Sequence, residues 1–231
     1  NQYVYAVDNI NLEVQDDEIL GLAGESGCGK TTLMNLIYDN VEFPLEITRG
    51  HVELVFDTDE GKGSLRSGEI PQAWWKEISY VPQGAMHVLN PVKKIKKQFL
   101  DVLPNIRRSE EKKVLQDIQK YLSQLNLEPS VLEAYPHQLS GGMKQRVLIA
   151  LATFLEPALI LADEPTTALD VVVQRQILTM LRKVQKRYKN TIIIVTHDLG
   201  VHYQLTDRLA VMYAGQLVEV GPTAKLFEGA S

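Results

Sequence analysis

The 231-residue sequence predicts an α/β fold built on a mostly parallel sheet, and three observations carry that prediction. Two near-continuous apolar runs, ALILAD at 158–163 and TIIIVT at 191–196, are typical of central parallel strands that are covered on both faces. Residues 170–188 between them repeat apolar side chains at helical spacing, as a crossover helix between parallel strands does. At 18–38 an apolar run, a glycine-rich loop and a second helical pattern follow in the order of a strand, a turn and a helix.

The N-terminal third predicts further strands. AVDNINLEV at 6–14 and HVELVF at 51–56 alternate apolar and polar residues, as half-buried strands do. The segment 57–72 contains three glycines and a proline among polar residues, which predicts an exposed loop. The apolar run in EISYVPQ at 77–83 then predicts another strand.

Strand patterns stop between residues 92 and 135. Apolar side chains recur at helical spacing between 114 and 125, so this part of the chain predicts a helical insertion into the α/β core. At the C-terminal end, RLAVMYAGQLVEVG at 208–221 has the pattern of a hairpin that turns at Ala214 and Gly215.

Composition is that of an ordinary soluble domain, with 45% hydrophobic and 23% charged residues. The formal net charge of -5 argues against a general affinity for nucleic acid or anionic membranes, since both require a basic surface. The longest apolar run, VLIALATFL at 147–155, is far shorter than the ~18 residues of a membrane-spanning helix. A single cysteine, Cys28, excludes an internal disulfide framework and favours a reducing compartment.

The loop GLAGESGCGKTT at 21–32 carries the first chemical motif. Its glycine, lysine and threonine spacing matches G-x-x-x-x-G-K-[ST], the phosphate-binding loop (P-loop) that joins a strand to a helix. Backbone N–H groups of such a loop surround an anion, the lysine reaches the β and γ phosphates, and the hydroxyl binds Mg²⁺. The predicted nucleotide-binding residues are Gly24, Ser26, Gly27, Cys28, Gly29, Lys30, Thr31 and Thr32.

Polar residues follow both central strands. Asp163 and Glu164 stand at the carboxyl end of ALILA, where α/β sheets bind their ligands, so a solvated turn is the less favoured interpretation. We expect Asp163 to hold the Mg²⁺ shell together with Thr31, and Glu164 to polarise an attacking water. His197 follows the second strand at the same edge, where its imidazole could contact the γ-phosphate.

A second anion-binding motif lies in LSGGMKQR at 139–146. Ser140, Gly141 and Gly142 precede a helical pattern, so backbone N–H groups and the positive end of the helix dipole are available there. One chain therefore carries two phosphate-binding devices, which need not serve the same nucleotide within one molecule.

Taken together, these motifs resemble those of the nucleotide-binding subunits of ATP-binding cassette (ABC) transporters, whose LSGGQ signature is similar to LSGGM here. The resemblance implies the ABC ATPase fold: a P-loop NTPase core with a mostly parallel sheet, an antiparallel β subdomain and a helical insertion. It implies one nucleotide-binding domain over 1–231. Within it, 1–91 and 156–231 would form the catalytic core with the β subdomain, and 92–155 the helical subdomain with the signature.

The resemblance also implies residue roles. Gln83 in YVPQ resembles the Q-loop residue that contacts Mg²⁺ and senses the membrane partner, and Asp170 in TALD resembles the D-loop residue at the dimer interface. Glu164 resembles the catalytic base and His197 the switch histidine. Tyr3 is the nearest candidate for the aromatic residue that stacks on adenine. In this family the signature of one subunit closes over ATP held by the P-loop of another.

Longer segments are similar to the ATPases of oligopeptide and dipeptide importers, among them YPHQLSGGMKQRV, DEPTTALDVVVQRQIL and THDLGV. This similarity implies ATP hydrolysis that powers solute import, with ATP and Mg²⁺ as cofactors, at the cytoplasmic face of the cell membrane. The implied partners are a second ABC ATPase subunit, identical or homologous, two transmembrane permease subunits and an extracellular solute-binding protein, with no nucleic acid.

Alternatives remain open at this point. Members of the same subfamily serve nickel and oligosaccharide uptake, so the solute is not settled by the resemblance. A non-transport ABC ATPase that acts on nucleic acid or ribosomes is the alternative function, which the acidic balance and the importer-like helical insertion disfavour. A regulatory module without turnover is disfavoured because Glu164 and His197 are both present.

Overall fold

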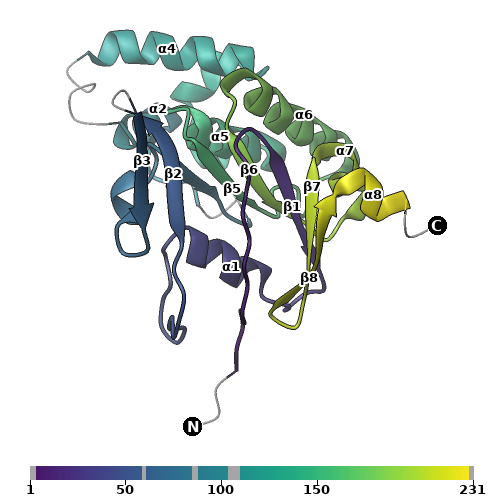
Figure 1. Cartoon of the computed structure of the whole chain (residues 1–231). Coiled ribbons are helices and arrows are strands. Elements are labelled where there is room, and N and C mark those ends of the chain that lie inside the picture. The colour runs from purple at the N-terminus through teal and green to yellow at the C-terminus, as the bar shows by residue number, and fades with distance from the viewer. Residues whose placement is uncertain (1–3, 59–60, 85–87, 104–109, 229–231) are drawn as a thin grey trace.

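The computed structural model describes residues 4–58, 61–84, 88–103 and 110–228 (Figure 1). Its main sheet has six strands in the order β4-β5-β6-β1-β7-β8. The bounds are β1 Ile19–Gly24, β4 Ile78–Val81, β5 Leu159–Asp163, β6 Thr191–Val195, β7 Arg208–Tyr213 and β8 Gln216–Pro222. All neighbours are parallel except β7 and β8, so the predicted mostly parallel sheet is confirmed.

The apolar runs predicted as central strands form β5 and β6, and both are buried on two faces. Ile160 and Ile192 belong to one hydrophobic core, while Leu161 and Ile193 belong to the other. This alternation follows from the two-residue period of a strand, which sends successive side chains to opposite faces. A continuous apolar sequence is what a strand needs when each face is covered.

Helices cover the two faces of the sheet (Figure 1). α1 packs on one core through Leu33 and Met34, while α5, α6 and α7 contribute to the core on the opposite face. The predicted helical insertion is present, because α2, α4 and α5 lie between β4 and β5 in the chain. The bounds are α1 Lys30–Ile37, α2 Ile95–Asp101, α4 Glu111–Gln124, α5 Gly141–Thr153, α6 Val171–Tyr188, α7 Leu199–Leu205 and α8 Thr223–Glu228. Short 3-10 helices occupy Ile70–Ala73, Pro129–Glu133 and Pro136–Gln138.

One predicted strand is wrong: residues 6–14 form no strand. Val7 and Ile10 pack against the core that α1 also covers, so the alternating pattern reflects alternating burial of an irregular segment. Asn9 has a φ of 50°, a left-handed conformation that interrupts an extended strand. An alternating pattern reports which side chains face the core, and strand pairing is a separate condition.

The predicted loop at 57–72 is also wrong, because it contains β3. β2 (Glu53–Thr58) pairs with β3 (Gly61–Arg66) in a separate antiparallel sheet, with Leu54 opposite Leu65. Glycines at 61 and 63 give β3 a weak strand propensity, and the pairing with β2 supplies its conformation. This two-stranded sheet is the antiparallel β element of the predicted fold class.

The C-terminal hairpin turns where the sequence predicts. Ala214 and Gly215 have φ values of 46° and 83°, as the two central residues of a tight hairpin turn require. Gly215 N–H donates to the carbonyl of Cys28 at 3.0 Å, and the Gly215 carbonyl accepts from Asp8 N–H at 2.8 Å. The turn therefore joins the N-terminal segment to the glycine-rich loop. Within the described ranges, no helix combines the length and apolar character that crossing a bilayer demands.

Candidate functional site

The glycine-rich loop lies between β1 and α1, and its glycines are required by close main-chain neighbours. A Cβ on Gly24 would stand 2.2 Å from the carbonyl oxygen of Met212 in β7. A Cβ on Gly29 would stand 2.1 Å from the carbonyl oxygen of Ala6. Both glycines also have positive φ values, 152° and 105°, which side chains rarely adopt. The loop conformation is therefore fixed by its surroundings as well as by its sequence.

Lys30 folds back into this loop. Its side chain is 7% exposed, and its Nζ donates to the carbonyls of Gly24 at 2.8 Å and Glu25 at 2.7 Å. Cys28 Sγ lies 3.6 Å from the same Nζ. Neutral carbonyls satisfy the ammonium group without neutralising it, so a positive charge is held at the centre of the loop, where an anionic phosphate would be attracted.

Asp163 ends β5 and is 2% exposed. Its Oδ2 accepts from the Tyr80 hydroxyl at 3.0 Å, and the Thr31 hydroxyl also donates to this carboxylate. Burial raises the pKa of Asp163, while the hydrogen bonds from Thr31 and Tyr80 act in the opposite direction. A buried carboxylate whose ionised form is disfavoured in this way is stabilised by a nearby cation.

Glu164 follows Asp163 and lies at the centre of a side-chain cluster. Its Oε2 accepts from Gln83 Nε2 at 3.2 Å and from the Thr167 hydroxyl, and its Oε1 lies 3.4 Å from His197 Nδ1. The Glu164 backbone has a φ of 45° and its N–H donates to the Val195 carbonyl at the end of β6. A positive φ is a strained conformation for a residue with a side chain, and such residues cluster at functional sites.

Sheet order explains why these residues meet. Gln83, Glu164 and His197 follow β4, β5 and β6, which are adjacent and parallel, so their carboxyl ends share one edge of the sheet. The structure thus brings together the acid, amide and imidazole that the sequence places far apart. His197 is 70% exposed, so the cluster opens to solvent on the histidine side.

Two further residues of this site were missed by sequence reasoning. Tyr80 reaches Asp163 because Tyr80 pairs with Leu161 in the parallel register, and Leu161 and Asp163 point to the same face. Burial raises the pKa of Tyr80 well above its usual value, so its hydroxyl remains a donor. Thr167 follows Glu164 by three residues in a turn, and a hydroxyl at that spacing was a signal that could have identified it.

The second anion-binding motif lies at the start of α5. Ser140 is its N-cap, because Ser140 Oγ accepts from Met143 N–H at 3.3 Å. Asp170 is the N-cap of α6 and accepts from Val173 N–H at 2.9 Å. A Cβ on Gly142 would stand 2.5 Å from Val173 Cγ1, so the two helix starts are in contact. The helix starts that carry Ser140, Gly141, Gly142 and Asp170 are thus joined through Gly142 and Val173.

Tyr3, the candidate for adenine stacking, lies outside the described residues. Aromatic side chains do line the far end of α1, where Tyr38 stacks on Trp74 with ring centroids 4.7 Å apart. Tyr80 is tilted against Tyr38 at 5.3 Å, and burial raises the pKa of Tyr38 to about 12. Trp74 Nε1 donates to the Tyr38 carbonyl, so these rings are structural partners.

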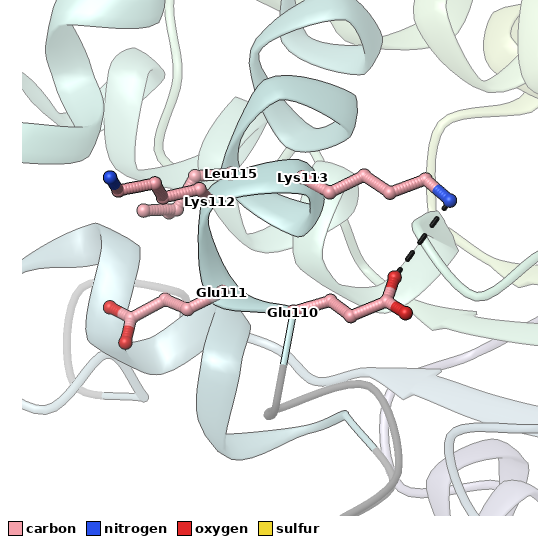
Figure 2. Close-up of a pocket in the computed structure, with 5 residues that line it drawn as sticks. All are labelled: Glu110, Glu111, Lys112, Lys113 and Leu115. Carbon is pink, nitrogen blue, oxygen red and sulfur yellow. Dashed lines mark ion pairs between the residues drawn. The ribbon is translucent and has the colours of Figure 1, made fainter.

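A cavity of about 770 Å³ lies at the start of α4. Figure 2 shows its charged side chains on two opposite sides of the helix, with Glu110 and Lys113 on one side and Glu111 and Lys112 on the other. Glu110 and Lys113 form an ion pair at 3.8 Å. Because its polar groups do not converge, this hollow lacks the character of a ligand site.

The chemistry of the donor set fits Mg²⁺. Asp163 and Thr31 offer oxygen atoms within hydrogen-bonding reach of each other, and Gln83 carries an amide oxygen at the same edge of the sheet. Among the residues that the structure describes, no three His, Cys, Asp or Glu side chains gather as a metal cluster. Mg²⁺ in nucleotide sites is commonly held by one or two protein oxygens together with substrate phosphates, so this sparse set suffices.

The chain is similar to known proteins over most of its length. The family model for the ABC transporter matches residues 7–167. The dipeptide transport ATP-binding protein DppD of Caldanaerobacter subterraneus subsp. tengcongensis is 39% identical over 230 residues, which are 97% of this chain and 69% of that protein. The oligopeptide transport ATP-binding protein OppD of Bacillus subtilis is also 39% identical, over 97% of this chain and 63% of its own length. This chain thus spans about two thirds of these relatives.

Solved structures extend the comparison to the fold. The dimeric structure of MJ0796, a bacterial ABC transporter cassette, has a TM-score of 0.74 and 28% identity, covering 95% of this chain and 91% of that chain. A dimeric post-hydrolysis state of the same cassette, bound to ADP and Pi, has a TM-score of 0.73 and 27% identity. The predicted ABC ATPase fold class is confirmed. With the phosphate loop, the acidic strand end and the family match in agreement, this chain belongs to the ABC transporter family.

Proposed function

We propose that this chain hydrolyses ATP as one half of a two-subunit ABC ATPase and thereby powers solute import through partner membrane subunits. The observation that carries the proposal is the convergence of Gln83, Glu164 and His197. Two buried charged residues, Lys30 in the glycine-rich loop and Asp163 at the end of β5, belong to the same site. A phosphate loop alone binds nucleotide, but a polarising carboxylate with an amide and an imidazole beside it is equipped for hydrolysis.

ATP would lie over the phosphate loop, with its phosphates facing the backbone N–H groups at the start of α1. Lys30 would exchange its carbonyl partners, Gly24 and Glu25, for phosphate oxygens, because a charged acceptor binds an ammonium more strongly than a neutral carbonyl does. The proposed phosphate-binding set is Gly24, Ser26, Gly27, Cys28, Gly29, Lys30, Thr31 and Thr32.

Thr31, Asp163 and Gln83 would hold Mg²⁺. Bound there, the ion supplies charge neutralisation for the phosphates. Asp163 contributes a carboxylate that burial has made dependent on a nearby cation, and Tyr80 keeps that carboxylate oriented.

Glu164 would orient the attacking water and accept its proton. Both carboxylate oxygens have partners, Oε2 in Gln83 and Thr167, and Oε1 in His197. A carboxylate oxygen can accept more than one hydrogen bond, so Oε1, with its one long contact to His197, could take the water while Gln83 and Thr167 hold Oε2.

The second half of the site would come from another subunit. Ser140, Gly141 and Gly142 stand at the start of α5 and Asp170 at the start of α6, two helix starts that meet through Gly142 and Val173. A signature delivered by a partner would complete the enclosure of ATP. The dimeric cassettes that resemble this chain support that assembly. We further propose that 92–155 acts as a helical subdomain carrying the signature, and that 1–91 and 156–231 form the catalytic core of one domain.

Peptides are the favoured solutes. The relatives are named as dipeptide and oligopeptide transport ATP-binding proteins. The glutathione import ATP-binding protein GsiA of Salmonella choleraesuis is 36% identical over 98% of this chain and 37% of its own length. Two transmembrane permease subunits, an extracellular solute-binding protein and a place at the cytoplasmic membrane face belong to the same proposal. DppD and OppD are transport proteins by name and GsiA is an import protein by name, which disfavours a role on nucleic acid or ribosomes.

The test is the rate of ATP hydrolysis against protein concentration, with Glu164→Gln compared with the wild type. A composite site predicts a rate that rises faster than linearly, and a loss of at least ~100-fold in Glu164→Gln. Glu219→Gln, which removes an exposed carboxylate on β8, is the matched control and should keep the wild-type rate. A strictly linear rate that is unaffected by Glu164→Gln would contradict the proposal.

A further inference from the structure

Gly142 lies in the first turn of α5, where its backbone is helical and imposes no need for glycine. What excludes a side chain is one neighbour. A Cβ built on Gly142 would stand 2.5 Å from Cγ1 and 3.2 Å from Cγ2 of Val173 in α6. Distances below 3.0 Å do not occur for real Cβ atoms, so this glycine is required by helix packing.

Val173 is fixed from two directions. Its N–H donates to Asp170 Oδ1 at 2.9 Å, which ties its backbone to the D-loop residue. Its side chain packs against the main hydrophobic core, as Met143 and Leu169 do. The two preceding valines differ, because Val171 and Val172 are 80% and 67% exposed. A β-branched side chain in a helix has one preferred rotamer, so Val173 cannot easily turn away.

We propose that Val173 is a positioning residue that locks the signature motif to the D-loop, and that Gly142 is glycine to accommodate Val173. Because Ser140 caps α5 and Asp170 caps α6, the contact between Gly142 and Val173 joins the two helix starts into one block. This inference rests on the proposed function, in which both helix starts face the second subunit. The block then meets that subunit as one preassembled surface.

The alternative explanation of Gly142 is that the nucleotide itself demands a bare backbone there. The two explanations differ in what a compensating change can do. Replacing Val173 by Ala removes both Cγ atoms, and the nearest remaining atom to a Cβ at position 142 is the Cβ of Val173, at 3.5 Å. That distance is ordinary van der Waals contact, so packing would be restored while the backbone at 142 would still carry a side chain.

The experiment is a compensation cycle in the Glu164→Gln background, where ATP-dependent dimerisation is measured by sedimentation. We expect Gly142→Ala to weaken dimerisation at least about tenfold, because overpacking displaces α5 against α6. Val173→Ala alone should weaken it less than about threefold, since a small gap leaves the helices in place. Gly142→Ala with Val173→Ala should return dimerisation to within about threefold of the parent.

Two controls keep the result specific. In the first control, Gly142→Ala is combined with Val172→Ala, which removes the two Cγ atoms of the adjacent, exposed valine. This double variant should dimerise as weakly as Gly142→Ala alone. The melting temperature of each nucleotide-free variant reports packing without any dimer. Gly142→Ala should lower the melting temperature by about 2–4 °C, and adding Val173→Ala to Gly142→Ala should reverse that loss.

Asp170→Ala tests the link to the D-loop. If the helix starts act as one block, combining Asp170→Ala with Gly142→Ala should weaken dimerisation by less than the product of the single effects. Effects that multiply independently would overturn the coupling. A Gly142→Ala and Val173→Ala pair as weak as Gly142→Ala, in both dimerisation and melting, would overturn the inference itself. A parent that fails to dimerise with ATP would contradict the proposed function, and the melting cycle would still decide the packing claim.

Discussion

His197 Nδ1 lies 3.4 Å from Glu164 Oε1, although the two residues belong to loops that follow different strands. Because His197 is mostly exposed, it can move onto a phosphate while Glu164 remains anchored by Gln83 and Thr167. The pair therefore links an anchored carboxylate to an exposed imidazole.

Replacing His197 by Ala should lower kcat for ATP hydrolysis by about 10²-fold and leave KM nearly unchanged. The reason is that the imidazole would act on the reacting phosphate and on Glu164 during turnover, while the phosphate loop holds the nucleotide. Steady-state kinetics measures both constants. His51→Ala, at an exposed position, is the control and should behave as the wild type. A change confined to KM would show that His197 serves ATP binding instead.

Asp163→Asn should stabilise the nucleotide-free protein and destroy its response to Mg²⁺. Burial raises the folded-state pKa of Asp163, so the native state binds the extra proton between the unfolded and folded pKa values, and stability from this group falls as pH rises through that window. At neutral pH the ionised carboxylate is therefore a cost. We expect the melting temperature of Asp163→Asn to rise by about 2–4 °C without ATP.

The same melting experiment supplies its own control. Adding ATP with Mg²⁺ should raise the melting temperature of the wild type and leave Asp163→Asn little changed, since a ligand that binds only the native state stabilises it. A variant that is less stable without nucleotide would mean that the hydrogen bonds from Tyr80 and Thr31 outweigh the burial of charge.

His202 should make stability depend on pH. It is fully buried, its Nε2 lies 3.0 Å from the Thr196 carbonyl, and burial lowers its pKa. Because the folded pKa lies below the unfolded value of 6.5, the contribution is present above 6.5 and is lost as pH falls through the folded pKa. Melting between pH 7.5 and 5 should show a loss of at most about 1.4 kcal/mol per pH unit from this group. His202→Gln keeps a donor for Thr196 and should give a shallower decline; an equally steep decline would assign the pH dependence elsewhere.

Gly29→Ala should damage the protein far more than Gly27→Ala. Both positions have positive φ, which costs a non-glycine residue about 1–2 kcal/mol. A Cβ at Gly27 meets nothing within 4 Å, whereas at Gly29 it would meet the carbonyl of Ala6 at 2.1 Å. We expect losses of about 1–2 kcal/mol for Gly27→Ala and at least about 3 kcal/mol for Gly29→Ala, measured by urea unfolding. Similar losses would mean that Ala6 yields at little cost.

Sequence patterns predicted the parts of the fold that are specified locally. β5 and β6 could be recognised because burial on both faces demands an unbroken apolar run, and α6 because one face repeats over many residues. β3 could not, because its glycines and polar residues form a strand only through pairing with β2. The strand predicted at 6–14 was wrong because an irregular, half-buried segment can alternate apolar and polar residues just as a strand does.

The site divides in the same way. Gln83, Glu164 and His197 were predicted because each lies within a recognisable motif at a strand end. Tyr80 and Val173 were not predicted. The partner of Tyr80 is Asp163, 83 residues away in the chain, and the partner of Val173 is Gly142 on another helix. Such residues become visible only once the register and the helix packing are known.

The carbonyl of Ala6 against Gly29 shows that the phosphate loop has a wall that its own motif does not encode. The turn at Gly215 forms the adjoining wall, because its N–H binds the Cys28 carbonyl and its own carbonyl binds Asp8. A fragment that begins after Asp8 would keep every residue of the motif and lose the wall at Ala6, and a fragment that ends before Gly215 would lose the wall at the turn. The smallest unit able to shape this loop is therefore almost the whole length of the chain.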